Sequence, residues 1–363
     1  MKLMKDRLNK YVCTNPFNYM DLQPYQVYVC CPSWCPTSIR EGKEEIEWDT
    51  DTAVDIRKSV LDGTYRHCDH NVCPSLNQLL NTNEIPGNFV EKEKFLSYHK
   101  INSIDDVKNI ETHPEHVLFG FDRSCNFKCP SCRIDLVPND DENTKTHQDK
   151  LKTLNEIETK FAKFIKTILI TGSGDPFYSK IYRNYLINFD SEKYPNLEQI
   201  NIITNGKMLN EKMWKSLSAK KHIKAIEISI DAGTKYTYEN VTRLNGDWDV
   251  LLDNLKFIST ITTINYLTLS FVVSEKNYLE MGIFYDIMLE IFKNSIFKLR
   301  LNYTQHVHWG DGAYTEEEVR KIQVFKKDHP FFDSFLDQLN YINEKEIVTH
   351  NFHHLIKKKL NII

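Results

Sequence analysis

Apolar runs and amphipathic segments alternate from about residue 114 to residue 310. Six short apolar runs have the length and composition of buried strands. These runs are His116–Phe121, Thr167–Thr171, Gln199–Thr204, Ala225–Ile230, Leu267–Val273 and Phe297–Tyr303. The helical segments between them include Lys150–Lys166, Glu211–Leu217, Trp248–Thr260 and Tyr278–Phe292. Repeated strand–helix units predict an α/β fold with a parallel sheet, and six strands predict an open, partial (β/α)6 barrel.

The first 98 residues have a different texture, rich in cysteine, proline and tryptophan. Gln26–Cys30 is typical of a strand, and Thr52–Leu61 has the apolar spacing of a helix that ends at Gly63. We therefore expect a small N-terminal domain over residues 1–98, the barrel over residues 99–312 and a helical C-terminal tail over residues 313–363. A domain this small with so many cysteines is expected to depend on a metal.

Composition narrows the class of protein. The chain has 363 residues and a net charge of −4, so no global positive field attracts nucleic acid. No apolar stretch approaches the roughly 18 residues of a membrane-spanning helix, and the start, MKLMKDRLNKYVC, lacks the apolar core of a signal peptide. We expect a cytoplasmic protein that binds neither nucleic acid nor membrane. In that compartment a cysteine-rich pattern favours metal ligation over disulfides.

Three cysteines follow the first predicted barrel strand in a C-x3-C-x2-C loop, at Cys125, Cys129 and Cys132. Thiolates are the usual ligands of a 4Fe–4S cluster, and three protein ligands leave one iron open to another molecule. Zinc is the alternative, but zinc needs a fourth ligand, and the next histidine, His147, lies fifteen residues beyond Cys132. The spacing favours the cluster.

Small and polar residues follow the next strands, at the ends where parallel sheets place their active sites. The second strand runs into Ser173-Gly174-Asp175, the third into Asn205, and the fourth into Ser229 and Asp231. Any one of these is ordinary turn chemistry. Because they fall in order after successive strands behind the three-cysteine loop, together they indicate one bound ligand.

With these motifs, the chain from about 114 to 310 resembles the radical S-adenosylmethionine (SAM) superfamily, whose fold is a partial (β/α)6 radical SAM barrel. The resemblance implies that Cys125, Cys129 and Cys132 hold a 4Fe–4S cluster whose open iron binds SAM. Ser173, Gly174 and Asp175 match the motif that holds the SAM amino group, with Ser in place of Gly and Asp in place of Glu. The other implied SAM contacts are Asn205 and Ser229 near the ribose or carboxylate, Arg243 at the carboxylate, and Val272 and Val273 at the adenine.

The first hundred residues resemble a SPASM domain, an auxiliary iron–sulfur module. The matching positions are Cys13 with Asn15-Pro16-Phe17, Cys30-Cys31, Trp34, Trp48, Ile56-Arg57-Lys58-Ser59, Gly63, Cys68 and Cys73-Pro74. Tyr25 stands where the family has a glycine. The resemblance implies one auxiliary 4Fe–4S cluster held by Cys13, Cys30, Cys68 and Cys73. A structural zinc site on the same thiols is the alternative.

This likeness implies an enzyme that cleaves SAM reductively to a 5′-deoxyadenosyl radical, using an electron donor such as flavodoxin or ferredoxin. We expect hydrogen abstraction from a peptide or a small polar substrate, such as a sugar, for oxidation or epimerisation. The chain would then be an oxidoreductase or an epimerase. The alternative is a redox or structural Fe–S or zinc protein without SAM turnover. Polar residues between Arg300 and His308 are candidates to line the substrate pocket.

Cys31 and Cys35 lie outside the implied auxiliary ligand set. A free cysteine is ordinarily a small buried hydrophobe. The sharper hypothesis makes Cys35, or with less support Cys31, a catalytic hydrogen donor that returns a hydrogen atom to the substrate radical. Such a donor would favour epimerisation over oxidation.

Overall fold

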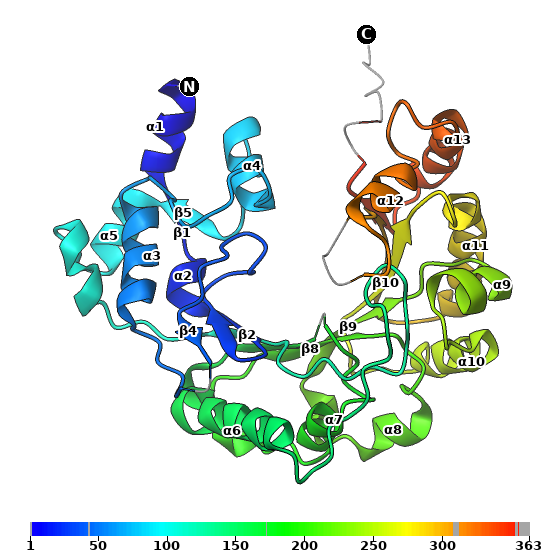
Figure 1. The fold of residues 1–363 in the computed structure, drawn as a ribbon, viewed down its shortest axis with the longest axis horizontal. Coiled ribbons are helices and arrows are strands. Elements are labelled where there is room, and N and C mark those ends of the chain that lie inside the picture. The colour runs from blue at the N-terminus through cyan, green and yellow to red at the C-terminus, as the bar shows by residue number, and fades with distance from the viewer. Residues whose placement is uncertain (1, 43, 172, 308–311, 353–354, 356–363) are drawn as a thin grey trace. The chain divides into compact units, whose positions relative to one another are not determined.

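The computed structural model describes residues 2–42, 44–171, 173–307, 312–352 and 355. The chain forms two compact units. The first unit consists of Met1–Asp122, Asp140–Ile170 and Asp190–Glu198, and the second of Arg123–Asn139, Thr171–Phe189 and Gln199–Ile363. Each unit has its own strands and helices (Figure 1). No helix in the described part of the chain is long and apolar enough to cross a membrane.

The strands of the first unit form a run in the order β4-β3-β2-β6-β7 and a separate antiparallel pair, β1 and β5. Their bounds are β1 Tyr11–Cys13, β2 Tyr19–Gln23, β3 Gln26–Tyr28, β4 Arg40–Glu41, β5 Phe89–Glu91, β6 His116–Phe119 and β7 Thr167–Ile170. β2 pairs with β6 and β6 with β7 in parallel, whereas β2, β3 and β4 pair antiparallel. The N-terminal segment therefore adds strands beside β6.

Helices surround the β1–β5 pair of the first unit, where α1, α3, α4 and α5 are seen in Figure 1. The helices are α1 Lys2–Lys10, α2 Asn15–Asn18, α3 Asp51–Leu61, α4 Pro74–Asn81, α5 Lys92–Tyr98 and α6 Lys145–Lys160, with 3-10 turns at Ile104–Asn109, Ala162–Phe164 and Ser191–Lys193. α3 begins after Thr50, whose side chain accepts a hydrogen bond from the Ala53 amide. Its Arg57 is buried, donates to the Pro16 carbonyl at 2.8 Å and pairs with Asp49 at 2.5 Å. Arg57 thus links α3 to α2 and to the segment that carries Asp49.

Every neighbouring strand pair in the second unit is parallel, in the order β12-β11-β10-β9-β8. The bounds are β8 Gln199–Thr204, β9 Ile223–Ser229, β10 Tyr266–Val273, β11 Lys298–Gln305 and β12 Val348–His350. Ile202, Ile228, Leu269 and Leu301 are buried along these strands. Apolar side chains of this kind on adjacent parallel strands explain why the runs read as continuous hydrophobic segments.

The helices of the second unit are accompanied by two 3-10 turns and one π-helical turn. The helices are α7 Lys180–Ile187, α8 Glu211–Ser216, α9 Lys235–Thr237, α10 Trp248–Ile258, α11 Met281–Phe292, α12 Glu316–Lys321 and α13 Phe332–Asn343. 3-10 turns lie at Ser218–Lys221 and Tyr278–Glu280. A π-helical turn over Tyr238–Thr242 follows α9 and ends at Arg243. Such π turns are rare and often lie at functional sites.

All six predicted barrel strands are confirmed, with ends that shift by up to two residues. The predicted α/β class with parallel strands is therefore confirmed. Of the predicted helices, the segment at Lys150–Lys166 differs most, because α6 begins at Lys145 behind a Thr144 cap and ends at Lys160. The expected C-terminal helices are present as α12 and α13, but the segment also contributes β12, which pairs with β11. The proposed domain boundaries stay predictions.

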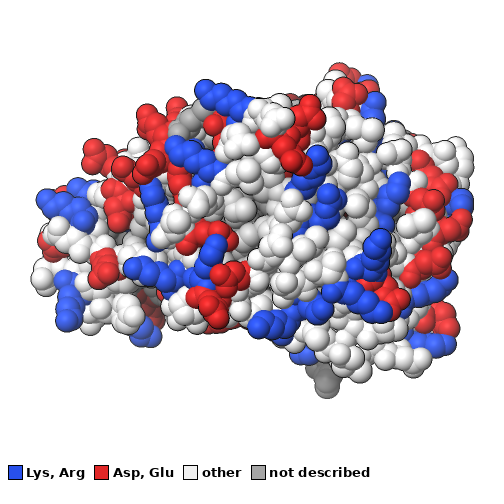
Figure 2. Space-filling view, turned by 90° about the horizontal axis from the view of Figure 1, so that it is seen from below, with Lys and Arg blue, Asp and Glu red and all other residues white. Residues whose placement is uncertain are grey.

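Acidic and basic side chains are mixed over the face seen in Figure 2, as the near balance of charges predicts.

Candidate active site

The three-cysteine loop is anchored by backbone hydrogen bonds within the second unit. The Cys125 amide donates to Val137 O at 2.8 Å, and the Lys128 amide donates to Leu244 O at 3.0 Å. The amides of Cys132 and Arg133 both donate to the Cys129 carbonyl at 2.9 Å, which makes a tight turn. Phe127, within the loop, is fully buried. The three thiols are thus carried on one fixed segment.

Each sulfur of this loop accepts hydrogen bonds from N–H groups. The Phe127 amide and Asn205 Nδ2 approach Cys125 Sγ at 3.5 and 3.9 Å. Arg243 donates to Cys129 Sγ at 3.5 Å, and Arg133 donates to Cys132 Sγ at 3.5 Å. Hydrogen bonds and nearby cations stabilise the thiolate form, which is the form that binds metal.

Burial and charge act against each other on these thiols. Burial raises the pKa of Cys125 to about 11, although the Arg133 charge lowers it. Burial also raises the pKa of Cys129, and Arg243 opposes that rise. The arginines therefore offset part of the cost of burying thiolates. This donor set fits a cluster held by three thiolates.

Asp175 lies at the centre of the loop that follows β7. It is fully buried, and its Oδ1 accepts hydrogen bonds from the amides of Phe177 and Tyr178 at 3.0 Å each. Its Oδ2 accepts from Thr204 Oγ1 at 2.7 Å and from the Asn205 amide at 2.9 Å. Burial raises its pKa, while these hydrogen bonds lower it. Asp175 thus ties its own loop to the end of β8.

The backbone groups of the residues beside Asp175 are held by the side chains of Thr171 and Arg133. Thr171 has a positive φ of 53°, and its Oγ1 accepts hydrogen bonds from the amides of Ser173 at 2.7 Å and Gly174 at 2.8 Å. The Ser173 carbonyl in turn accepts a 2.8 Å hydrogen bond from Arg133, so the loop is linked to the cysteine segment. Gly172 lies outside the described residues.

Asn205 lies between this loop and the cysteine loop. Its Nδ2 donates to Asn126 Oδ1 at 2.8 Å as well as approaching Cys125, and its Oδ1 accepts from the Lys207 amide at 3.0 Å. Ser229 is the last residue of β9 and is partly buried. The structure therefore brings Asn205 to the cysteines.

A buried ion pair joins the ends of two more elements. Arg243, at the end of the π turn, pairs with Asp231 at 2.6 Å, and Asp231 also accepts the Val272 amide at 2.7 Å. Asp231 has a positive φ of 58°, and Asn277 Nδ2 donates to its carbonyl at 2.9 Å. Burial raises the pKa of Asp231, and Arg243 opposes that rise. Burial lowers the pKa of Arg243, but Asp231 and Cys129 more than reverse this.

One atom of this pair lacks a protein partner. Arg243 is only 9% exposed, and its Nε is buried with no hydrogen-bond acceptor among the described residues. A buried guanidinium N–H without an acceptor is costly. Its position beside Cys129 fits a ligand that brings an acceptor oxygen to the site. The assignment of Arg243 to the SAM carboxylate stays a prediction.

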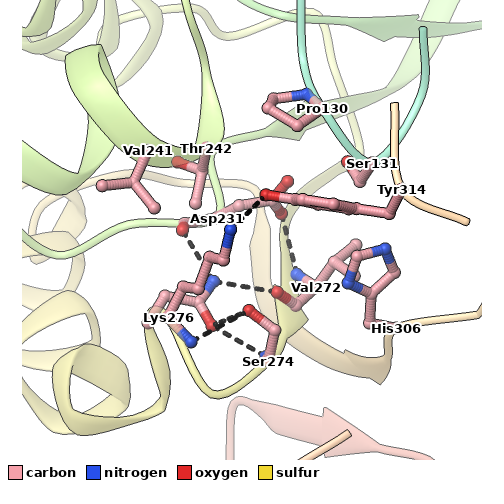
Figure 3. Close-up of a pocket in the computed structure, with 11 residues that line it drawn as sticks. Pro130, Ser131, Asp231, Val241, Thr242, Val272, Ser274, Lys276, His306 and Tyr314 are labelled. Atoms are coloured by element: carbon pink, nitrogen blue, oxygen red, sulfur yellow. Dashed lines mark hydrogen bonds between the residues drawn. The ribbon is translucent and has the colours of Figure 1, made fainter. Parts of the chain in front are cut away.

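A pocket adjoins the ion pair, lined by Asp231, Val272, Lys276, His306 and Tyr314 among others (Figure 3). Lys276 Nζ donates to the Tyr314 hydroxyl at 2.8 Å. The Ala313 amide donates to the Pro130 carbonyl at 2.8 Å, which holds the Tyr314 segment against the cysteine loop. Val272 lines this pocket, as expected of an apolar ligand contact, whereas Val273 is buried in the core.

Of the residues between Arg300 and His308 that were expected to line a substrate pocket, some line it and others do not. His306 lines the pocket. Tyr303 is fully buried and donates to the Met281 carbonyl at 2.9 Å, so it belongs to the core. Gln305 bonds to Asn351, and His308 lies outside the described residues. Sequence reasoning missed the pairing of Lys276 with Tyr314.

Five thiols of the first unit line a second cavity: Cys13, Cys30, Cys35, Cys68 and Cys73. Neutral amides donate to three of the sulfurs, from Asn88 to Cys13 at 3.4 Å, from Asn15 to Cys30 at 3.4 Å and from the Leu76 amide to Cys73 at 3.5 Å. Burial raises the pKa of Cys13 to about 12. All four predicted auxiliary ligands therefore border one space. Over the described residues, no three His, Cys, Asp or Glu side chains form a ready site for a single metal ion.

Cys35, the predicted hydrogen donor, is one of these five thiols. It is 2% exposed and interacts with the neighbouring thiol of Cys68. That contact lowers the pKa of Cys35 and raises that of Cys68. The structure thus places Cys35 among the auxiliary thiols, and its role as a hydrogen donor stays a prediction.

Comparison with known proteins shows a similarity to one protein family. Residues 121–273 match the profile of the Radical SAM superfamily. A search of curated proteins gives no match. Among solved structures, Streptococcus suis SuiB bound to its precursor peptide SuiA is 15% identical with a TM-score of 0.44, over 76% of this chain and 64% of that chain.

Two further structures are similar at the same level. anSMEcpe with bound AdoMet and the Cp18Cys peptide is 17% identical with a TM-score of 0.36, over 53% of this chain and 50% of that chain. TYW1 with a lysine–pyruvate adduct is 14% identical with a TM-score of 0.37, over 61% of this chain and 70% of that chain. This chain thus spans less than two thirds of the SuiB and anSMEcpe chains. TM-scores this low carry no weight for the substrate. Residues 121–273, which include the three-cysteine loop, are thus similar to the radical SAM superfamily, whose members use a 4Fe–4S cluster and SAM.

Proposed function

We propose that this chain is an enzyme that cleaves SAM reductively and abstracts hydrogen from a peptide or a small polar substrate such as a sugar, for oxidation or epimerisation. The observation that carries this proposal is the buried Nε of Arg243, which lacks an acceptor beside the Cys129 sulfur. Arg40 Nε of the first unit is also buried without an acceptor, and what distinguishes Arg243 is that it donates to the Cys129 sulfur. When bound, the cluster and SAM supply one-electron cleavage of a carbon–sulfur bond and removal of a hydrogen atom from the substrate.

Cys125, Cys129 and Cys132 would hold the cluster. Arg133 and Arg243 each donate to one of these sulfurs, and hydrogen bonds to cluster sulfurs help to set the reduction potential. The two guanidinium groups also bring positive charge to a largely buried set of thiolates. The chain therefore holds and electrically balances the group that binds there.

Arg243 would bind the SAM carboxylate through its Nε, while its other nitrogens stay on Asp231 and Cys129. Each carboxylate oxygen of Asp175 already accepts two hydrogen bonds. In this proposal its main role is to order the loop that carries Ser173 and Gly174, which would bind the SAM amino group. Asn205 and Ser229 would face the ribose or carboxylate, and Val272 the adenine. An arginine held on two sides is pre-organised for a third partner.

The substrate would lie toward Lys276 and Tyr314. Their hydrogen bond holds an ammonium group and a phenol at the lining of the pocket in Figure 3. Such a pair favours a substrate with carbonyl, carboxylate or hydroxyl groups. Peptides and sugars both meet this requirement. An electron donor such as flavodoxin or ferredoxin would reduce the cluster.

In the first unit, we propose one auxiliary 4Fe–4S cluster on a ligand set that the sequence assigns to Cys13, Cys30, Cys68 and Cys73. All four border one cavity, and neutral amides donate to three of the sulfurs. The thiols fit four-cysteine ligation of a cubane. A structural zinc ion on the same thiols remains the second candidate, and metal analysis separates the two.

The test is anaerobic reconstitution with iron and sulfide, followed by SAM and dithionite and an assay for 5′-deoxyadenosine. The intact chain should form it, and Cys129→Ala should not. Arg320→Ala, which changes an exposed arginine paired with Glu316, is the matched control and should behave like the parent. A reconstituted protein that binds iron but forms no 5′-deoxyadenosine would favour the alternative, an Fe–S protein without SAM turnover.

A further inference from the structure

The first unit has five cysteines around one cavity, one more than a four-thiolate cluster requires. Cys35 is the additional member, because the SPASM-like pattern leaves it out. Cys31, the neighbour of Cys30 in sequence, is not among the residues that line this cavity. The surplus thiol is therefore Cys35 and not the second residue of the Cys30-Cys31 pair.

Backbone geometry brings Cys35 to this position. The amides of Trp34 and Cys35 donate to the Cys31 carbonyl at 2.9 and 3.0 Å, so the chain turns between Cys31 and Cys35. The Asp69 amide then donates to the Trp34 carbonyl at 2.8 Å, which ties this turn to the segment that carries Cys68. Cys35 and Cys68 thus sit side by side on two linked segments.

Cys35 and Cys68 both line this cavity, on segments that the Asp69–Trp34 hydrogen bond joins. The three other thiols of the cavity are held separately, because Asn88, Asn15 and the Leu76 amide each donate to a different sulfur. Three positions of a four-ligand set are therefore assigned to one thiol each. The remaining position has two adjacent thiols.

We propose that Cys35 and Cys68 are alternative ligands for one corner of the auxiliary cluster, each able to complete the set with Cys13, Cys30 and Cys73. This inference rests on the auxiliary cluster of the proposed function. Exchange would balance: an iron–sulfur bond to Cys68 would be replaced by one to Cys35, and the Cys35 thiol proton would pass to the released Cys68 sulfur. No oxidant or reductant is needed.

The test uses the full chain with Cys125, Cys129 and Cys132 all changed to Ala, so that any remaining cluster is the auxiliary one. In this parent, Cys35→Ala, Cys68→Ala and the double variant are reconstituted anaerobically and assayed for iron, zinc and the EPR spectrum of the reduced cluster. Cys31→Ala is the matched control, a cysteine from the same segment that does not line the cavity.

We expect about four iron atoms per chain in the parent, in both single variants and in the control, and loss of iron in the double variant. The EPR spectra of the two single variants should differ from each other, because a different thiolate completes each cluster. Loss of iron in either single variant would overturn the inference, as would iron retained by the double variant. A parent without iron would instead contradict the auxiliary cluster itself, and the inference with it.

Discussion

The two thiol sites of this chain differ in the charge of the groups that hydrogen-bond to sulfur. In the second unit, two arginines donate to the sulfurs of Cys129 and Cys132. In the first unit, the donors to Cys13, Cys30 and Cys73 are neutral amides. Charge-assisted hydrogen bonds are roughly twice as strong as neutral ones. The site proposed to bind the SAM carboxylate thus carries the positive charge.

The same contrast holds for two buried carboxylates. Asp231 pairs with Arg243 in the second unit. Asp21, on β2 of the first unit, accepts a 2.7 Å hydrogen bond from the neutral side chain of Gln23. Burial raises the pKa of Asp21 to about 6, and the Gln23 hydrogen bond only partly opposes this. Arg243 thus pairs with Asp231 where a ligand is proposed, whereas no cation among the described residues pairs with Asp21.

The largest expected effect is on iron content. If each site holds a cubane, the chain should contain about eight iron atoms, four per cluster. Changing Cys125, Cys129 and Cys132 to Ala should remove about half of them, as measured by metal analysis of anaerobic protein. Zinc in the remaining site would contradict the auxiliary cluster but leave the SAM site standing.

Arg243→Ala is expected to weaken SAM binding while iron content stays intact. A charge-assisted hydrogen bond lost from a dry site is worth roughly 1.5–3 kcal/mol, or about ten- to more than a hundredfold in affinity. Asp175→Ala should also weaken binding, because four donors lose their acceptor and the loop loosens. Titration calorimetry of the reconstituted protein measures both. Unchanged affinity in the two variants would show that these residues do not hold SAM.

Asp21→Asn tests the uncompensated carboxylate. Because the folded pKa of about 6 lies above the ordinary value of 3.8, the charged form is disfavoured in the folded state. Stability should therefore fall as pH rises from about 4 through about 6, by at most about 3 kcal/mol for a shift of this size. The variant should be more stable than the parent at pH 7, and this advantage should shrink toward pH 4 in urea unfolding. An advantage that is constant with pH would contradict this account.

The smallest expected effect concerns reduction potentials. Arg133→Gln should lower the potential of the cluster at Cys132, because a cationic donor to sulfur is lost. Asn88→Ala should lower that of the auxiliary cluster by about half as much, because its bond to Cys13 is neutral. EPR-monitored redox titration measures both shifts. Equal shifts would remove the proposed distinction between the two sites.

Local sequence patterns predicted the strands and the thiol loop but not the pairings between distant residues. The six apolar runs predict strands correctly, because strands that are buried between parallel neighbours are continuously apolar. The Asp231–Arg243 pair was not foreseen, because it depends on a π turn at Tyr238–Thr242 that no periodicity reports. β2 was also missed, since Tyr19–Gln23 is short and holds the buried Asp21. The position of Cys35 near Cys68 was also not predicted, because it depends on the backbone turn between Cys31 and Cys35.

The comparison of the two sites is tested most directly by the EPR spectrum of the reduced chain before and after SAM is added. The account predicts that SAM changes the signal of the cluster at Cys125, Cys129 and Cys132 and leaves the auxiliary signal unchanged. In the variant with these three cysteines changed to Ala, SAM should therefore have no effect on the spectrum. A spectrum of the intact chain that ignores SAM, or a SAM effect that persists in the variant, would contradict the account.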